Sequence, residues 1–349
     1  MQQSVQRRRF IRSSVIAGVG WGVLNAFPGI AAQKKSNAAP GKRVGIIGLD
    51  TSHSTAFTAG LNNAAADAYD GYRIVAAYPQ GSSSIKSSYE RIPAYTEEVK
   101  KAGVEIVPSI AALLQKVDVV MLETNDGRPH LQQALEVIKA GKTLFIDKPV
   151  AGSLADVLAI YDAAKKYRVP VFSSSSLRYA TNVQDTASGK AAGKVLGADT
   201  YSPSPLEASH PDFFWYGIHG IEILLTVMGM GCLQVSRVNT AATDIVTGIW
   251  NDGRTGTFRG NRSGPNEYGG TAFCEKAVVH LGPYAGYEPL LKEIVQFFNT
   301  GVPPVSAEAT LEVYAFMEAA DESKRKNGAA IRLEAVMQKA LAANRQRKW

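Results

Sequence analysis

The sequence predicts an α/β protein in which a doubly wound parallel sheet precedes an α+β domain with an open-faced, mostly antiparallel sheet. Two observations carry this prediction. Over residues 42–176, short β-branched runs alternate with helical segments, which is typical of a parallel sheet covered by helices on both faces. Over residues 177–333, strand patterns mostly follow one another directly, as in an antiparallel sheet that buries one face against helices.

The first domain is expected to alternate regularly between strands and helices. Its strands are expected at residues 43–49, 72–78, 104–107, 117–124, 143–147 and 169–176, and its helices at 54–66, 95–103, 109–116, 131–141 and 154–167. Thr51, Ser52 or Ser54 would cap the start of the first helix, and Ser109 that of the third. Glycine after a helix, as at Gly103, favours a left-handed C-cap.

The second domain breaks this alternation. Its strands are expected within 198–205, 233–252, 253–261 and 271–282, and its helices at 217–228, 287–301 and 306–328. Ser306 begins the last of these helices with a pattern close to a capping box. Residues 334–349 are expected to form a C-terminal tail with a solvated basic end.

The N-terminal segment carries an export pattern. Arg8 and Arg9 precede Phe10 and Ile11, no acidic residue occurs before residue 32, and a modestly apolar run follows. These features are typical of a Tat-type signal peptide over residues 1–31, which predicts the Tat machinery as a partner and a periplasmic or other extracytoplasmic location. Residues 32–41 are expected to be a linker.

Charge and cysteine content exclude some partners and leave others open. The formal charge of the whole chain is +7, and loss of residues 1–31 would leave 34 Lys and Arg against 31 Asp and Glu. That surplus is too small to indicate a nucleic-acid partner. Cys232 and Cys274 are too few for a cysteine-rich zinc site, and the sequence leaves their pairing open.

The first strand runs into an altered phosphate-binding turn. The dinucleotide fingerprint is G-x-G-x-x-G, and here it reads Gly48-Leu49-Asp50-Thr51-Ser52-His53. Asp50 replaces the glycine that lets the backbone approach a pyrophosphate, and His53 replaces the third glycine. An unpaired carboxylate at Asp50 would repel that dianion. The hydroxyls of Thr51 and Ser52 at a helix N-terminus would still form an anion site.

Four segments, in order along the chain, resemble motifs of the Gfo/Idh/MocA oxidoreductases, the glucose-fructose oxidoreductase and inositol dehydrogenase family. They are HLQQALEVIKAGKTLFIDKP, IDKPVAGS, FFWYGIHGIEIL and GVPPVSAEATLEVYAFMEAADESKR. The resemblance spans most of residues 42–333. It implies a Rossmann domain followed by an open-faced α/β domain, in agreement with the pattern of elements above.

The resemblance implies two catalytic residues. Lys148 corresponds to the motif lysine that lies between nicotinamide and substrate, where an ammonium can stabilise alkoxide character as hydride leaves. His219 corresponds to the acid/base histidine. Many members have an aspartate four residues before this histidine, whereas this chain has Trp215. Glu222 lies on the same helical face as His219, and it would either orient that ring or pair elsewhere.

The cofactor prediction combines retained and missing features. The residues expected at a cofactor are Gly48, Leu49, Asp50, Thr51, Ser52, His53, Thr124, Asn125, His130, Asp147 and Lys148. The second strand lacks the acid that usually binds the ribose, and the run Ser82–Ser84 with Lys86 would either hold a 2′-phosphate or form a polar loop. A metal site from Asp50, His53 and Asp147 has no recognised ligand spacing, so none is predicted.

Taken together, the sequence predicts an exported NAD(P)-dependent oxidoreductase that acts on a sugar, polyol or glycoside with a tightly held nucleotide. Arg178, Tyr179, Trp215 and Tyr216 are expected to line the substrate site, although core positions for the two aromatic residues at 215 and 216 are an alternative. A non-catalytic ligand-binding protein and a cofactor-free lyase or hydrolase remain alternatives. The resemblance also implies a homo-oligomer formed through the open sheet.

Overall fold

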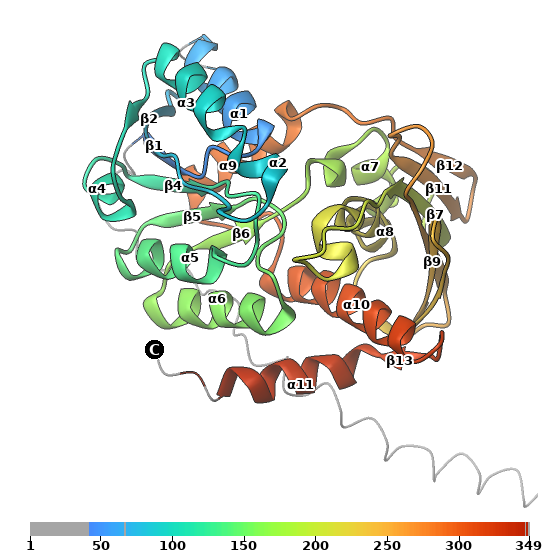
Figure 1. Ribbon diagram of the computed structural model, residues 1–349. Helices are drawn as coiled ribbons and strands as arrows, with labels where there is room; N and C mark the ends of the chain where they lie inside the picture. The colour runs from blue at the N-terminus through green and yellow to red at the C-terminus, as the bar shows by residue number, and fades with distance from the viewer. Residues whose placement is uncertain (1–41, 66–67, 346, 348–349) are drawn as a thin grey trace, which may run out of the picture. The chain divides into compact units, whose positions relative to one another are not determined.

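The computed structural model describes residues 42–65, 68–345 and 347, and these residues form two sheets with their covering helices (Figure 1). The predicted signal peptide at 1–31 and the linker at 32–41 lie outside the described residues. Sheet A contains only parallel strands, in the order β3-β2-β1-β4-β5-β6. Its strands are β1 (Arg43–Ile47), β2 (Arg73–Tyr78), β3 (Glu105–Ile106), β4 (Val119–Leu122), β5 (Thr143–Ile146) and β6 (Val171–Ser173).

Helices cover both faces of sheet A, as the continuous apolar strands require. The helices between its strands are α1 (Ser52–Asn63), α2 (Lys86–Tyr89), α3 (Ile92–Lys101), α4 (Ile110–Leu114), α5 (His130–Lys139) and α6 (Leu154–Tyr167). Ile47, Leu122 and Ile146 belong to a core with α4, α5 and α6, whereas Ile46 and Phe145 face α1 on the other side. Strands buried on both faces are typical of a doubly wound sheet.

Sheet B is mixed and has the order β12-β11-β7-β10-β9-β8-β13. Only the pair β7 and β10 is parallel among its described pairings. Its strands are β7 (Val195–Pro203), β8 (Cys232–Asn239), β9 (Thr243–Trp250), β10 (Thr255–Asn261), β11 (Gly269–Cys274), β12 (Val278–Leu281) and β13 (Ile331–Arg332). The longer helices α8 (Ile218–Met228) and α10 (Ala307–Arg325) lie against one face of this sheet and leave the other face open (Figure 1).

Two C-terminal segments lie elsewhere than the sequence predicted. Helix α9 (Glu288–Thr300) was expected within the second domain, but its apolar residues, Phe297 among them, pack into the core of sheet A beside α1 (Figure 1). The predicted tail at 334–349 is wrong for most of its length, because Leu333–Arg345 form helix α11 against α6. Val336 and Ala340 bury an apolar stripe at helical spacing, which stabilises this helix.

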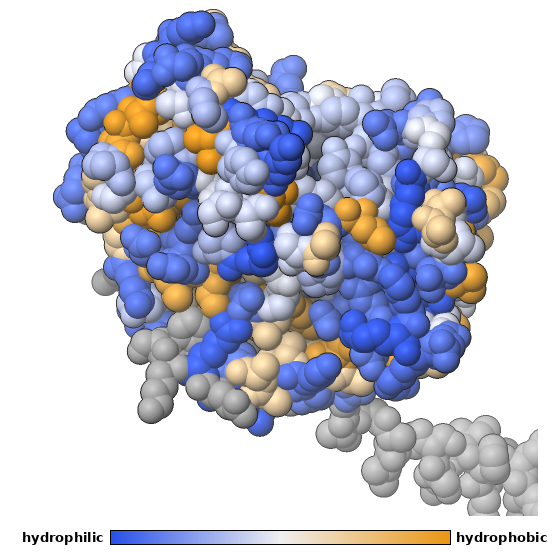
Figure 2. Space-filling model, in the orientation of Figure 1, coloured by the Kyte–Doolittle hydropathy of each residue, from blue (hydrophilic) through white to orange (hydrophobic). Residues whose placement is uncertain are grey.

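Other features of the surface and the cysteines are simple. The face shown in Figure 2 is largely hydrophilic, and its apolar side chains are scattered. Within the described part of the chain, no helix has both the length and the hydropathy that a membrane span needs. Cys232 and Cys274 are both free thiols, and burial raises the pKa of Cys232 to about 12.

Candidate active site

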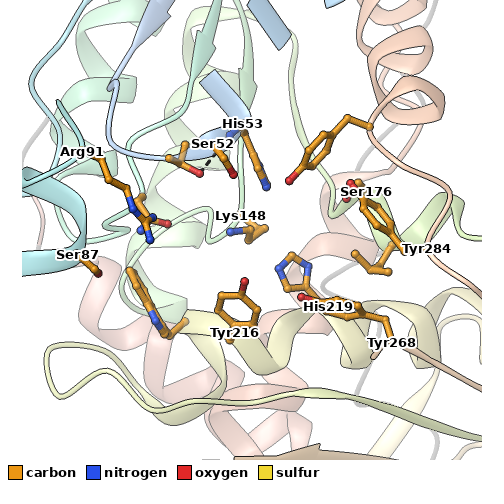
Figure 3. A pocket seen from close by; sticks show the side chains of 15 residues that line it. Ser52, His53, Ser87, Arg91, Lys148, Ser176, Tyr216, His219, Tyr268 and Tyr284 are labelled. Carbon is orange, nitrogen blue, oxygen red and sulfur yellow. Dashed lines mark hydrogen bonds between the residues drawn. The ribbon is translucent and has the colours of Figure 1, made fainter. Parts of the chain in front are cut away.

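A cavity of about 220 Å³ lies where the carboxyl ends of β1, β4 and β5 face helix α8 (Figure 3). Ligands of open α/β sheets bind at this edge, where the strand order reverses between β1 and β4. The first domain contributes Thr51, Ser52, His53, Ser87, Arg91, Asn125 and Lys148 to its lining. The second half of the chain contributes Ser176, Leu177, Trp215, Tyr216, His219, Tyr268, Tyr284 and Tyr287.

Lys148 follows β5 and extends into the middle of the cavity (Figure 3). Lys148 is only 5% exposed, and its Nζ lies 6.0 Å from the centroid of the Tyr216 ring. The backbone just after it is fixed by Val150, whose N–H donates to the hydroxyl of Tyr314 on α10 at 2.5 Å. The ammonium therefore extends from an anchored loop and faces the space where a ligand would bind.

His219 lies in the first turn of α8 and faces Lys148 across the cavity (Figure 3). Its Nδ1 lies 2.7 Å from the Oγ of Ser175, so Nε2 is the ring nitrogen that remains for a ligand. Burial first, and then the Lys148 ammonium, lower the pKa of His219 well below its usual range. The imidazole is therefore neutral at pH 7 and can accept a proton.

Glu222 does not contact His219 directly, and the second of its two predicted roles holds. Its carboxylate accepts hydrogen bonds from Ser174 Oγ and Ser175 N, each at 2.9 Å. It also forms an ion pair with Arg178 at 2.9 Å. Glu222 thus fixes the loop that presents Ser175 to His219, which is an indirect contribution to the orientation of the ring.

Aromatic residues form one wall of the cavity. Trp215 and Tyr216 lie in the π-helical turn Phe213–Gly217 that leads into α8, and both line the cavity. Tyr268, Tyr284 and Tyr287 complete the wall from segments that the sequence did not assign to the site. Aromatic faces beside polar groups are suited to the alternating apolar and hydroxyl surfaces of a sugar or polyol.

Arg178 and Tyr179 are not among the residues that line this cavity, so their contact with substrate stays a prediction. Arg178 is directed to Glu222 instead, because that buried carboxylate needs a charged partner. Tyr179 packs against the apolar core of sheet A, and burial raises the pKa of its hydroxyl. Both residues support the site from behind.

Asp50 is buried beside the altered turn and does not line the cavity. Its carboxylate accepts hydrogen bonds from the backbone N–H groups of Ser82 at 2.8 Å and Asn125 at 2.9 Å. A Cβ at Gly81 would lie 2.1 Å from this carboxylate, so Gly81 makes room for it. Asp50 therefore joins the loops after β1, β2 and β4, and burial raises its pKa.

The other residues of the turn keep the geometry of a phosphate-binding loop. Gly48 has φ 92°, and a Cβ there would lie 2.5 Å from Thr124 N, so only glycine fits. Leu49 is fully buried in the core of sheet A. Thr51 caps α1, and with Ser52 and His53 it presents the N-terminus of this helix to the cavity.

The remaining predicted cofactor residues divide into two groups. Asn125 lines the cavity, whereas Thr124 and His130 are buried behind it. The ring of His130 lies between the carbonyl oxygens of Thr124 at 2.6 Å and Val150 at 3.2 Å, so it ties two loops together. Asp147 is buried beneath the cavity beside His53, with 2.7 Å between His53 Nδ1 and Asp147 Oδ2.

The serine run after β2 is already engaged with protein groups. Ser82 Oγ donates to Asp126 at 2.8 Å, and Ser84 Oγ accepts from Arg128 at 2.6 Å. The exposed Lys86 forms an ion pair with Glu90. These contacts favour the polar-loop interpretation and leave this run without a free cluster for a 2′-phosphate.

Residues 42–175 match the model of an oxidoreductase family with an NAD-binding Rossmann fold, Gfo/Idh/MocA. The match covers less than half of the chain, so it shows similarity to the Gfo/Idh/MocA oxidoreductases for the N-terminal domain. No curated protein matched the chain. The resemblance expected from the IDKP segment is thereby confirmed, whereas FFWYGIHG lies outside the matched residues.

Solved structures share the fold over nearly their whole length. A probable dehydrogenase from Thermotoga maritima is 19% identical, with a TM-score of 0.68 over 84% of this chain and 99% of that chain. Scyllo-inositol dehydrogenase from Lactobacillus casei, solved with NAD(H) and scyllo-inositol, is 16% identical, with a TM-score of 0.66 over 83% and 98%. UDP-N-acetylglucosamine 3-dehydrogenase from Acidithiobacillus ferrooxidans is 14% identical, with a TM-score of 0.64 over 80% and 97%.

The residues of the cavity fit the NAD that this family's Rossmann domain binds. The tight turn at Gly48 is retained, and the N-terminus of α1 with Thr51 and Ser52 opens onto the cavity. The Asp50 carboxylate does not face that opening, because two backbone amides hold it inside the loop. Arg91, which the sequence did not assign to the site, adds a cation to the lining.

Proposed function

We propose that the protein is an exported NAD(P)-dependent oxidoreductase that acts on a sugar, polyol or glycoside. The observation that carries this proposal is the convergence of Lys148 and His219 on one cavity at the carboxyl edge of sheet A. The aromatic wall from Trp215 to Tyr287 supports a carbohydrate-like substrate. The inositol and UDP-N-acetylglucosamine dehydrogenases with the same fold support the same substrate class.

Lys148 and His219 have different roles in the oxidation of a carbinol. For His219 Nε2 to accept the hydroxyl proton, Nδ1 must carry the ring hydrogen and donate it to Ser175 Oγ, which lies 2.7 Å away. The Lys148 ammonium stabilises the negative charge that develops on the carbinol oxygen. When bound, NAD(P) supplies the hydride acceptor. Thr51, Ser52 and Asn125 would bind the phosphate and ribose groups of this nucleotide.

Export and assembly belong to the same proposal. The Tat-type pattern at Arg8 and Arg9 favours export of a folded protein, which allows a nucleotide to be loaded before export and retained. Cell fractionation of the native host tests this location.

Exposed apolar side chains on the strands of sheet B, such as Val238 and Phe273, support a homo-oligomer through this sheet. Light scattering of the purified protein measures its mass.

The nucleotide content of the exported protein tests the proposal most directly. We expect protein purified from its native host without added nucleotide to release about one equivalent of NAD(H) or NADP(H) on denaturation, identified by mass spectrometry. Titration of stripped protein with each nucleotide and a panel of sugars and polyols follows. A protein that contains no nucleotide and binds none on titration would contradict the redox proposal and favour a cofactor-free lyase or hydrolase that uses Lys148 and His219.

The pH dependence of kcat/KM reports on His219. Because burial and Lys148 lower its pKa, the neutral base persists below pH 6.5 and becomes protonated only at lower pH. We therefore expect the acid limb of the profile to lie well below pH 6.5. An acid limb at or above pH 6.5 would contradict this assignment.

Ser175→Ala should lower kcat by roughly 10- to 100-fold with little change in KM, since the His219 ring loses its orienting partner.

A further inference from the structure

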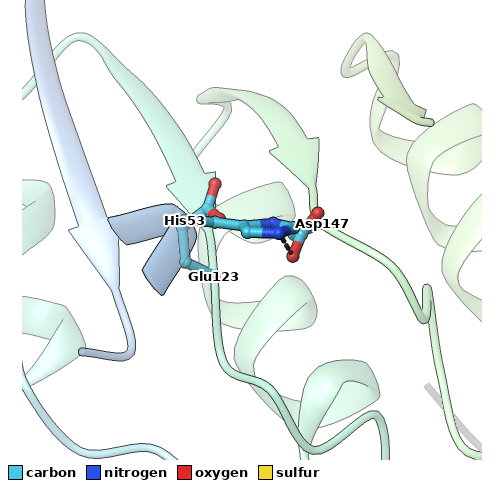
Figure 4. A group of neighbouring side chains, drawn as sticks. All are labelled: His53, Glu123 and Asp147. Atoms are coloured by element: carbon cyan, nitrogen blue, oxygen red, sulfur yellow. Dashed lines mark ion pairs between the residues drawn. The ribbon is translucent and has the colours of Figure 1, made fainter. Parts of the chain in front are cut away.

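Three buried side chains converge beneath the cavity described above. His53 lies in the first turn of α1, Glu123 follows β4, and Asp147 follows β5 (Figure 4). One nitrogen or carboxylate oxygen from each lies within 4.8 Å of the others. The residues are 8%, 0% and 1% exposed, respectively. Glu123 was absent from the sequence-based site, although an acid directly after the apolar run 119–122 was a visible signal.

The polar atoms of this cluster lack hydrogen bonds. Neither oxygen of Glu123 nor of Asp147 has a hydrogen-bond partner among the described residues. His53 Nδ1 is close to Asp147 Oδ2, at 2.7 Å, but the pair is not aligned as a hydrogen bond. Buried carboxylates without partners are costly, so native proteins pair them with a cation or a proton or use them to bind a metal.

We propose that His53, Glu123 and Asp147 bind a divalent first-row transition metal, with Zn²⁺ and Mn²⁺ as the best candidates. A neutral imidazole and two carboxylates are donors that both ions accept, and their two negative charges balance the ion. Metal–ligand bonds of about 2.0–2.2 Å place two ligands of one ion at most about 4.4 Å apart. In a tetrahedral site the ligand atoms lie about 3.4 Å apart, so side-chain movements of up to about 1 Å would close the cluster around an ion.

The position of the cluster links the ion to the cavity. His53 lines the cavity beside Ser52, and Lys148 follows Asp147 directly in the chain. Three protein ligands leave at least one coordination position for an exogenous oxygen, as in catalytic metal sites. A hydroxyl or phosphate oxygen of a bound molecule would take that position. The proposal also explains why a histidine replaces the third fingerprint glycine, and it stands independently of nucleotide binding.

Metal binding by the stripped protein tests the proposal. Protein purified from its native host is treated with a chelator and titrated with Zn²⁺ and separately with Mn²⁺ by calorimetry at pH 7.5. We expect one equivalent to bind, and we expect Glu123→Gln and Asp147→Asn each to weaken binding by at least tenfold. Co²⁺ should give visible absorption bands typical of nitrogen and oxygen ligands in the wild type and lose them in Glu123→Gln.

Glu312→Gln is the matched control. Glu312 is also a buried carboxylate, but it accepts hydrogen bonds from Gly231 N and Cys232 N, away from the cavity. This variant should bind the metal as the wild type does. The proposal is overturned if the wild type binds neither ion at millimolar concentration, or if Glu123→Gln binds as tightly as the wild type. Nucleotide content is measured separately, so failure here leaves the oxidoreductase proposal standing.

Discussion

Replacing Lys148 by methionine should lower kcat by about 10²- to 10⁴-fold, which corresponds to about 3–5 kcal/mol of transition-state stabilisation. Methionine keeps most of the length and apolar volume of the side chain but removes the ammonium beside Tyr216 and His219. The loss should appear in kcat more than in KM, because the charge on the carbinol oxygen develops only in the transition state. Steady-state kinetics with the best substrate of the sugar panel measures this split.

A charge-matched control separates the effect of the Lys148 ammonium from the effect of removing any one positive charge from the protein. Lys190→Met removes one positive charge from an exposed side chain that pairs with Asp185, outside the cavity. It should leave kcat unchanged. Lys148→Arg keeps a cation but changes its shape, and partial activity is expected from it. If Lys148→Met retained kcat within about threefold, the ammonium would not act on the reacting oxygen.

The sequence predicted the order of elements well where the physics is local. Apolar runs, helix caps such as Ser109 and Ser306, and the change of pattern near residue 177 are readable without neighbours. The packing partners of α9 and α11 could not be predicted from the sequence. Their apolar stripes indicate that each packs somewhere, but only the tertiary structure shows that α9 returns to sheet A and that α11 lies against α6.

The site shows the same limit at the level of single residues. Lys148, His219 and the residues Thr51–His53 were predicted from local motifs, and they line one cavity. Asp50 was interpreted as a charge facing a pyrophosphate, whereas its carboxylate is held by amides that are 32 and 75 residues away in sequence. No local pattern contains that information, because hydrogen bonds between loops depend on how the strands are arranged.

The tyrosines of the wall were missed for a related reason. Tyr268, Tyr284 and Tyr287 lie in segments that flank β11, β12 and α9, and no motif marks them. They reach the cavity because sheet B and α9 bring these flanks toward His219, whose ring lies 5.7 Å from that of Tyr268. Arg178 was expected at the substrate site, but its side chain is directed to Glu222.

Replacing Arg237 by methionine should lower the free energy of unfolding by about 3–5 kcal/mol. Arg237 lies on β8 with a fully buried side chain that bonds to Asp244 at 2.9 Å, Asp321 at 2.5 Å and Asp212 at 2.6 Å. Its guanidinium lies 4.1 Å from the Phe213 ring centroid. Removing this cation takes the ion-pair partner from the buried Asp321, whereas Asp244 keeps Arg262 and Asp212 keeps Lys324. The unpaired Asp321 carboxylate adds a penalty to the loss of the contacts themselves.

Urea or guanidinium unfolding of the variant and of Arg325→Met measures the effect. Arg325 forms ion pairs with Glu318 and Glu322 at the surface of α10, so its loss should cost about 1 kcal/mol or less. A difference below about 1 kcal/mol for Arg237→Met would mean that the carboxylates find other partners. Such a result would mean that the ion pairs of Arg237 do not stabilise the packing of β8 against α10 and the turn at Phe213.

The sign of the pH dependence provides an independent check on the cause. Burial raises the pKa of Asp321 to about 7, with the Asp212 and Glu318 carboxylates adding to the effect, even though Arg237 acts in the opposite direction. A carboxyl group whose pKa is raised in the folded state binds protons there that the unfolded state has lost, so it lowers stability as pH rises from about 4 to 7. Without Arg237 this pKa must rise further. The deficit of Arg237→Met relative to wild type should therefore be larger at pH 8 than at pH 5, because at the lower pH protonation relieves the unpaired charges, whereas a deficit caused only by lost packing would be the same at both.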